Sequence, residues 1–276
     1  LIAGYANVNS GVVQNVFNIS GAGRIYAGRY NWNLPRWREL ESRITFGQDV
    51  RYFDNNVFPV GTTVALVPDY VVRPLSATYT GTWRGARSET TGFIGVSRNL
   101  PGGANADQAQ FDLVRPGAKD TYVIYRAGFN YLRSLPADLQ WRVNMSAQTT
   151  PYLLVPGEQF GIGGQDSVRG FLEREIINDK GFRGTTELYS PDFGARTTIA
   201  NLRARALAFY DWGQVTRNDP QPFDVAAAHI ASVGVGLRIF HASSLSVRAD
   251  YARVVDGAGT RNSGDWRGHF SLIYAF

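Results

Sequence analysis

The chain has 276 residues, of which 13% are aromatic, 18% are charged and 30 are glycine. This length fits one large all-β domain, and the charged fraction is low for a soluble globular protein. No run of about 18 apolar residues occurs, which excludes a membrane-spanning helix but leaves open a membrane β-barrel, whose strands turn only every second residue to lipid. The formal net charge of +5 is spread without a Lys/Arg cluster, so we expect no nucleic-acid partner.

Segments of alternating apolar and polar residues follow one another along the chain. In the segment 139–148, Trp141 and Met145 fall on one face of the expected strand, whereas Arg142 and Asn144 fall on the other. The expected strands are 2–9, 23–34, 40–53, 75–84, 89–98, 121–132, 139–148, 181–191, 202–212, 230–240, 243–254 and 266–276. The sequence therefore predicts an all-β fold of about twelve strands.

Two features favour a transmembrane barrel over a soluble β-sandwich, whose strands would also alternate. The expected strands are about 10 to 14 residues long, and Tyr or Trp recurs near the ends of their apolar faces, as in the aromatic girdles of membrane barrels. Short turns such as 34–38 and 134–137 also alternate with long polar loops such as 100–120 and 149–180. We therefore expect a transmembrane antiparallel β-barrel whose apolar face contacts the lipid bilayer of the outer membrane of a Gram-negative bacterium.

The last expected strand places Phe270, Leu272, Tyr274 and Phe276 on one face. A terminal strand that closes on phenylalanine resembles the signal by which outer-membrane barrels are recognised for assembly, and Phe276 is the candidate residue. The alternative is an ordinary final strand, whose last residue would be aromatic about one time in eight with this composition.

One stretch, 163–171, is too rich in glycine for the interior of a strand or helix. It carries Arg169 among small residues, with Gly163, Gly164 and Gly170 close by. Glycines allow a backbone to turn sharply and to approach a wall closely. We therefore expect a long ordered loop that folds inward and brings a positive charge into the barrel.

An arginine inside a barrel needs an acidic partner, because an uncompensated buried charge costs several kcal/mol. Asp211 lies on the same polar strand face as Arg203 and Arg205, so it faces the lumen. Glu187 is a second candidate, since its position on the expected strand 181–191 is also on the polar face. A solvated loop arginine is the alternative for Arg169.

Nothing in the sequence supports an enzyme. His229, His241 and His269 are scattered without the spacing of metal ligands, cysteine is absent, and no Gly-x-Ser-x-Gly elbow or phosphate-binding motif occurs. His269 is near Asp265 and Ser271, but it falls in the last expected strand, where alternate residues simply face the lumen. We expect no catalytic residue, no metal and no cofactor.

Two motifs are specific enough to suggest a protein family. The run from Pro156-Gly157-Glu158-Gln159-Phe160 through Gly163-Gly164-Gln165-Asp166-Ser167-Val168-Arg169-Gly170-Phe171 resembles the signature of two-partner secretion outer-membrane transporters of the haemolysin and haemagglutinin type. The second element, Phe209-Tyr210-Asp211-Trp212-Gly213, is similar to the aromatic-x-Asp-x-Gly motif of the same superfamily, which also contains the barrel-assembly insertases. The motif residues around Arg169 are Gly163, Gly164, Val168, Gly170 and Phe171.

The resemblance implies a barrel of sixteen strands in which the motif aspartate holds the loop arginine, here Asp211 with Arg169. It implies a pore that secretes and helps to activate a large partner exoprotein without ATP. Residues 1–276 would then form the C-terminal part of the barrel, and the first strands and the N-terminal periplasmic domains would lie outside this sequence. An insertase of the same superfamily and a diffusive porin are the alternatives.

Overall fold

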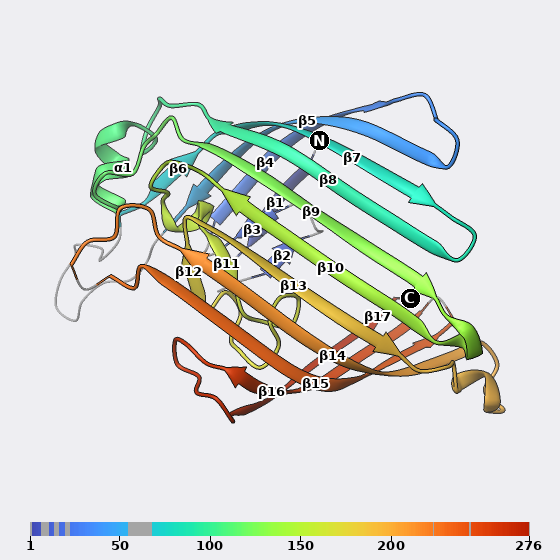
Figure 1. The fold of residues 1–276 in the computed structure, drawn as a ribbon. Coiled ribbons are helices and arrows are strands. Elements are labelled where there is room, and N and C mark those ends of the chain that lie inside the picture. The colour runs from blue at the N-terminus through green and yellow to red at the C-terminus, as the bar shows by residue number, and fades with distance from the viewer. Residues whose placement is uncertain are drawn as a thin grey trace.

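The computed structural model describes residues 2–6, 11–13, 17–19, 23–54, 68–222, 224–242 and 244–275. Twelve of the strands follow one another in chain order as a single antiparallel sheet, which curls around an interior space (Figure 1). They are β1 (Ile2–Ala6), β4 (Gly23–Asn33), β5 (Leu40–Phe53), β7 (Pro74–Arg84), β8 (Ser88–Asn99), β9 (Val123–Ser134), β10 (Gln140–Thr149), β13 (Lys180–Tyr189), β14 (Leu202–Thr216), β15 (Ala227–His241), β16 (Leu245–Asp256) and β17 (Trp266–Tyr274).

These twelve strands confirm the predicted all-β barrel wall. The strand predicted over 40–53 is found with the same bounds, whereas 202–212 and 230–240 are parts of the longer strands β14 and β15. Two expectations lie outside the described residues, namely Phe276 as an assembly signal and positions 7–9 of the first strand.

The structure also contains smaller elements outside the twelve-strand order. β6 (Tyr70–Val72) pairs with the end of β5, β2 (Gly11–Val13) pairs with β3 (Phe17–Ile19), and α1 (Gln108–Val114) begins after the capping residue Asp107. None of the described helices is long and apolar enough to cross a membrane. Short elements of this kind carry too little periodicity to be predicted from sequence.

Alternation along β14 shows how the two faces of the wall differ. Leu207, Phe209 and Asp211 are buried toward the interior, whereas Tyr210 points outward and is 41% exposed. The register carries this pattern across the sheet, because Asp211 lies opposite Thr185 of β13 and Ser232 of β15. The interior face therefore combines polar side chains such as Asp211 with buried apolar ones such as Leu207 and Phe209, whereas the outward face is apolar and rich in Tyr and Trp.

The connections fall into two classes at the two ends of the wall. The connections that follow β5, β8, β10, β14 and β16 begin at one end of the wall, which we call the long-loop end. Connections at the other end, the short-turn end, are 34–39, 85–87, 135–139, 190–201 and 242–244. The connection 190–201, which contains a 3-10 turn at Gly194–Arg196, is the exception in this second group, because it is longer than 257–265 at the other end.

The assignment of faces predicts opposite effects for two arginine substitutions. Ile94, near the middle of β8, points outward and is 63% exposed, whereas Asn130 of β9 faces the interior. Ile94→Arg should lower the free energy of unfolding by about 2 to 4 kcal/mol, because a charge there sits in hydrocarbon. Asn130→Arg, the control, should change it little. Urea unfolding of the native protein in liposomes measures both values, and equal losses would contradict the assignment.

Candidate functional site

The connection between β10 and β13, residues 150–179, folds back into the barrel, and we call it the inner loop. It contains a 3-10 turn (Pro156–Glu158) and two short strands, β11 (Phe160–Ile162) and β12 (Ile176–Asn178), which pair antiparallel. Figure 1 shows β11 and β12 inside the curved sheet rather than above it. The predicted inward-folded loop is therefore present.

Glycine conformation shapes the tip of the inner loop, residues 163–175. Gly163, Gly164 and Gly170 have φ angles of +103°, +105° and +99°, a region that other residues rarely adopt. The Gly164 N–H donates to the Val168 carbonyl at 3.1 Å, and the Arg174 N–H donates to the Gly163 carbonyl at 3.2 Å. The tip is thus a compact turn with its own hydrogen bonds, which projects the Arg169 side chain toward the wall.

The guanidinium of Arg169 is 2% exposed and all five of its N–H groups have an acceptor. Nε and Nη2 donate to the two carboxylate oxygens of Asp211, each at 2.7 Å. Nη1 donates to Glu187 at 2.8 Å and to Asp250 at 3.2 Å, and Nη2 also donates to the Thr185 hydroxyl at 3.0 Å. Three carboxylates on three strands therefore share one arginine of the inner loop.

Electrostatics keeps this arginine charged. Burial alone would lower the pKa of Arg169, but the carboxylates of Asp211, Glu187 and Asp250 outweigh burial and raise that pKa. The backbone N–H of Arg169 adds a further bond of 3.0 Å to Asp211. Main chain and side chain of the same residue are thus both fixed on β14.

Two aromatic rings of the barrel wall also contact the tip. The guanidinium carbon of Arg169 lies 3.4 Å from the ring centroid of Phe209, a cation–π arrangement that excludes water from one face of the ion. The Gly170 N–H donates to Nε2 of His269 at 3.0 Å, so this nitrogen acts as the acceptor of a neutral imidazole. His269 of β17 therefore contacts the motif directly.

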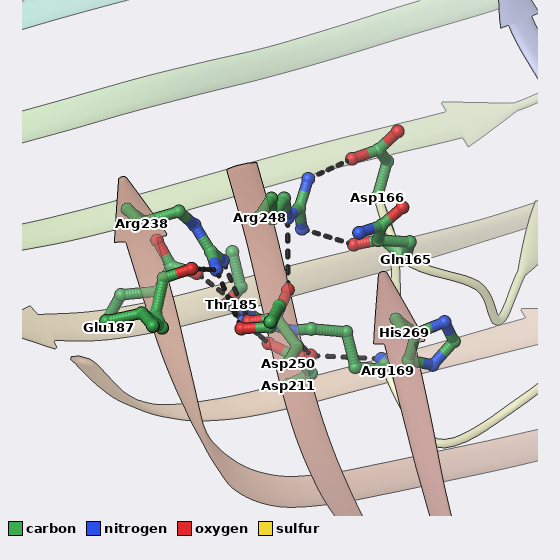
Figure 2. A network of polar contacts seen from close by, with 12 residues as sticks. Gln165, Asp166, Arg169, Thr185, Glu187, Asp211, Arg238, Arg248, Asp250 and His269 are labelled. Atoms are coloured by element: carbon green, nitrogen blue, oxygen red, sulfur yellow. Dashed lines mark hydrogen bonds and ion pairs between the residues drawn. The ribbon is translucent and has the colours of Figure 1, made fainter. Parts of the chain in front are cut away.

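A second layer of charge surrounds Asp250. Arg238 of β15 donates a hydrogen bond of 2.8 Å to the Asp250 carboxylate. Arg248, which like Asp250 lies on β16, donates one of 3.1 Å to the same carboxylate. Arg248 also holds Asp166 of the tip at 2.5 Å. Figure 2 shows this alternation of positive and negative groups, which extends from Arg169 to the far side of the tip.

Apolar packing accompanies the ion pairs. Val168 and Phe171, which flank Arg169 and Gly170, are fully buried. They belong to a cluster formed by Phe160, Ile162, Val168, Phe171, Val215, Ala228, Ile230 and Val254. Gly213 makes room for it, because a Cβ atom there would lie only 3.0 Å from Cγ2 of Ile162. The tip is therefore seated on β14, β15 and β16 by both charge and apolar contact.

The end of the inner loop is fixed at the long-loop end by Asp179. Its carboxylate accepts bonds from Arg115 at 2.5 and 2.9 Å and from the N–H groups of Leu154 and Asn218 at 2.9 and 2.8 Å. Burial opposes ionisation, but the Arg115 bond and these N–H groups lower the pKa of Asp179 below its usual value. Asp179 is therefore ionised and joins three separate connections.

Comparison with known proteins now identifies the family. A family model described as haemolysin secretion/activation protein ShlB/FhaC/HecB matches residues 4–239. This chain belongs to the ShlB/FhaC/HecB family. No curated protein sequence matches the chain significantly.

Solved structures support the same fold. CdiB from Escherichia coli superposes with a TM-score of 0.73 at 17% identity, covering 99% of this chain and 49% of that one. CdiB from Acinetobacter baumannii gives 0.65 at 18% identity, covering 95% and 44%. BamA from Haemophilus ducreyi, lacking POTRA domains 1-3, gives 0.61 at 13% identity, covering 98% and 57%. The chain thus spans about half the length of these structures, and as a ShlB/FhaC/HecB barrel it is a protein of the Gram-negative outer membrane.

The structure places both acidic candidates, Asp211 and Glu187, on the Arg169 guanidinium. The contribution of Asp250 was not predicted, although a signal for it exists. Asp250 shares the polar face of the strand expected over 243–254 with Ser246 and Arg248, and that face is turned to the lumen. Among the described residues, no group of three or more His, Cys, Asp or Glu side chains is placed to hold a metal ion.

The left-handed turn at Gly163 yields a first prediction for the tip. A Cβ atom there would lie 2.6 Å from the Leu172 carbonyl oxygen, whereas Gly102 has the same φ of +103° with nothing within 4 Å. Gly163→Ala should therefore raise tryptic cleavage after Arg174 about 10- to 100-fold, as expected for about 1 to 3 kcal/mol of strain. Gly102→Ala, which shares the unfavourable φ but lacks the clash, should leave this cleavage rate unchanged. Equal cleavage rates in the two variants would contradict the described turn.

The paired N–H donors of the Arg169 guanidinium yield a second prediction. A lysine has the charge but not the planar donor pair that matches both oxygens of Asp211. Arg169→Lys should therefore weaken docking of the tip by about 1.5 to 3 kcal/mol, seen as faster hydrogen exchange of the 163–175 backbone amides. Arg203→Lys on β14, the strand that carries Asp211, is the control, because the Arg203 side chain is 71% exposed. If Arg169→Lys exchanged no faster than this control, charge alone would hold the tip.

Proposed function

We propose that the native protein containing residues 1–276 is an outer-membrane pore that secretes and helps to activate a large partner exoprotein without ATP, and that this chain is the C-terminal part of its barrel. The observation that carries the proposal is the docked tip of the inner loop in a member of the ShlB/FhaC/HecB family. A loop that occupies the lumen and is held by ion pairs can close a pore and can also be released from it.

The lumen offers a surface suited to an extended polypeptide. The inward face of β7, β8, β9 and β10 carries uncharged hydroxyl and amide side chains in its middle, among them Thr80, Thr91, Asn130 and Asn144. Such groups exchange hydrogen bonds with a passing backbone without holding it strongly. The sequence contains no nucleotide-binding motif, so folding of the exoprotein outside the cell would supply direction.

An insertase of the same superfamily is the second candidate, because the fold is also similar to that of BamA from Haemophilus ducreyi. An insertase would accept a client strand at a free sheet edge, and β1 and β17 are the two ends of the described strand order. A diffusive porin is less consistent with an inner loop that crosses the lumen.

A deletion strain separates these functions. We expect loss of the native protein to remove one large exoprotein from the medium or cell surface while the levels of other outer-membrane barrels stay unchanged. Quantitative mass spectrometry of both fractions measures this, and complementation with wild type is the control. A general fall in barrel levels would instead indicate an insertase, and an unchanged exoprotein profile would contradict secretion.

A further inference from the structure

The inner loop contacts the barrel wall at two widely separated places. Its tip is seated on β14 to β16, whereas its first part, residues 150–159, which we call the stem, packs under β4, β5 and β9. Figure 1 shows β5 and β14 to β16 on opposite sides of the interior, with β11 and β12 between them. The stem residues Leu154 and Val155 are buried in a cluster formed with Ile25, Ala27, Phe53, Tyr70, Val72, Phe111, Ala118, Tyr122 and Ile124.

Glu158, at the end of the stem, is a charge that the Arg169 network does not use. Its side chain has no exposed surface, and Oε1 accepts a hydrogen bond of 2.7 Å from Nη1 of Arg51 on β5. Arg126 of β9 lies 3.6 Å from the other oxygen, Oε2. Arg51 is itself nine-tenths buried and lies 3.4 Å from Asp49, so the stem carboxylate completes a buried row of alternating charge.

Neutral contacts hold the same turn in place. The Gly157 N–H donates to the Tyr70 hydroxyl at 2.9 Å, and Gln148 donates to the Glu158 carbonyl at 2.9 Å. Burial and the neighbouring Glu158 carboxylate raise the pKa of Tyr122 well above its ordinary value, so this phenol stays protonated beside the carboxylate. The backbone of the 156–158 turn is therefore held by neutral hydrogen bonds, whereas the Glu158 side chain is held through the Arg51 ion pair.

A buried carboxylate is costly unless it makes a specific pair, so its presence in the stem needs a reason. The Arg51 pair attaches the loop to β5, six strands before β14 in the sheet order, where Arg169 attaches the tip. We propose that Glu158 is a second anchor of the inner loop, so that the loop spans the lumen as a strut fixed at both walls and the pore opens fully only when both anchors are released.

The two anchors should then control different parts of the loop. Release of Arg169 alone frees the tip while the stem stays on β5, and release of Glu158 alone frees the stem while the tip stays on β14. This inference rests on the proposed function only in treating the loop as the closure of a pore. Its test needs no exoprotein. The proposal of a second anchor can therefore fail while the secretion proposal stands, and the secretion proposal can fail while the second anchor stands.

The absence of cysteine from the 276 residues makes the test direct. Val155→Cys in the stem and Val168→Cys in the tip each place the only thiol of residues 1–276 at a fully buried position, and any cysteine elsewhere in the full-length protein is first replaced by serine. The native full-length protein is labelled in membranes with a water-soluble maleimide, and the labelling rate reports how often each part leaves its cluster. Glu158→Gln, which keeps size but removes charge, is introduced into both backgrounds.

We expect Glu158→Gln to raise labelling of the stem thiol at least about tenfold and to change labelling of the tip thiol far less. Arg169→Lys should do the opposite. Glu41→Gln is the matched control, because Glu41 lies on the same strand as Arg51 but forms its ion pair with Arg84 where both side chains are about half exposed. A stem labelling rate for Glu158→Gln equal to that of this control would overturn the proposal.

A double substitution tests whether Glu158 acts through Arg51. Arg51→Gln combined with Glu158→Gln should label the stem no faster than Arg51→Gln alone, because each substitution breaks the same pair. Additive effects would mean that Glu158 supports the stem by another route and would overturn its assignment to β5. In planar bilayers, Glu158→Gln should also raise the fraction of time the pore is open, and an unchanged open fraction would contradict an anchoring role.

Discussion

A single guanidinium inside the barrel sets the constraints on the rest of the structure. A buried arginine is tolerated only when each donor meets an acceptor, and Arg169 meets this requirement with groups from β13, β14 and β16 at once. The left-handed glycines of the tip, the inward parity of Asp211 and the flat ring of Phe209 all follow from this requirement. Charge, backbone conformation and strand register are therefore coupled at one residue.

Attachment by buried ion pairs favours two states of the inner loop, docked and released, over intermediate positions. A buried ion pair adds little net stability compared with apolar residues of the same shape, but breaking one partner away is costly because the other charge is left buried. The tip has several such pairs and an apolar seat, so partial withdrawal would leave Asp211 buried without its arginine, whereas Asp250 would keep Arg238 and Arg248. The loop is thus either docked or far enough out for water to reach the carboxylates, which is the behaviour a gate requires.

Much of this could be predicted from the sequence, and the parts that could not share a physical cause. Period-two alternation located the strands and put Asp211 and Glu187 on the inward face, because side-chain direction is a local property of a strand. Alternation does not say which inward groups meet across the lumen, so the pairs of Arg169 with Asp250 and of Glu158 with Arg51 were missed. α1, β6 and the β11–β12 pair were also missed, because tertiary contacts rather than local pattern decide such short elements.

Charge is distributed unevenly around the lumen. The wall that docks the tip carries Glu187, Asp211 and Asp250, whereas the middle of the β7 to β10 wall carries hydroxyl and amide groups. Arg126 and Arg142 face the interior nearer the two ends of this wall, so only its middle carries uncharged groups. The acidic groups of β13, β14 and β16 are engaged in holding the inner loop.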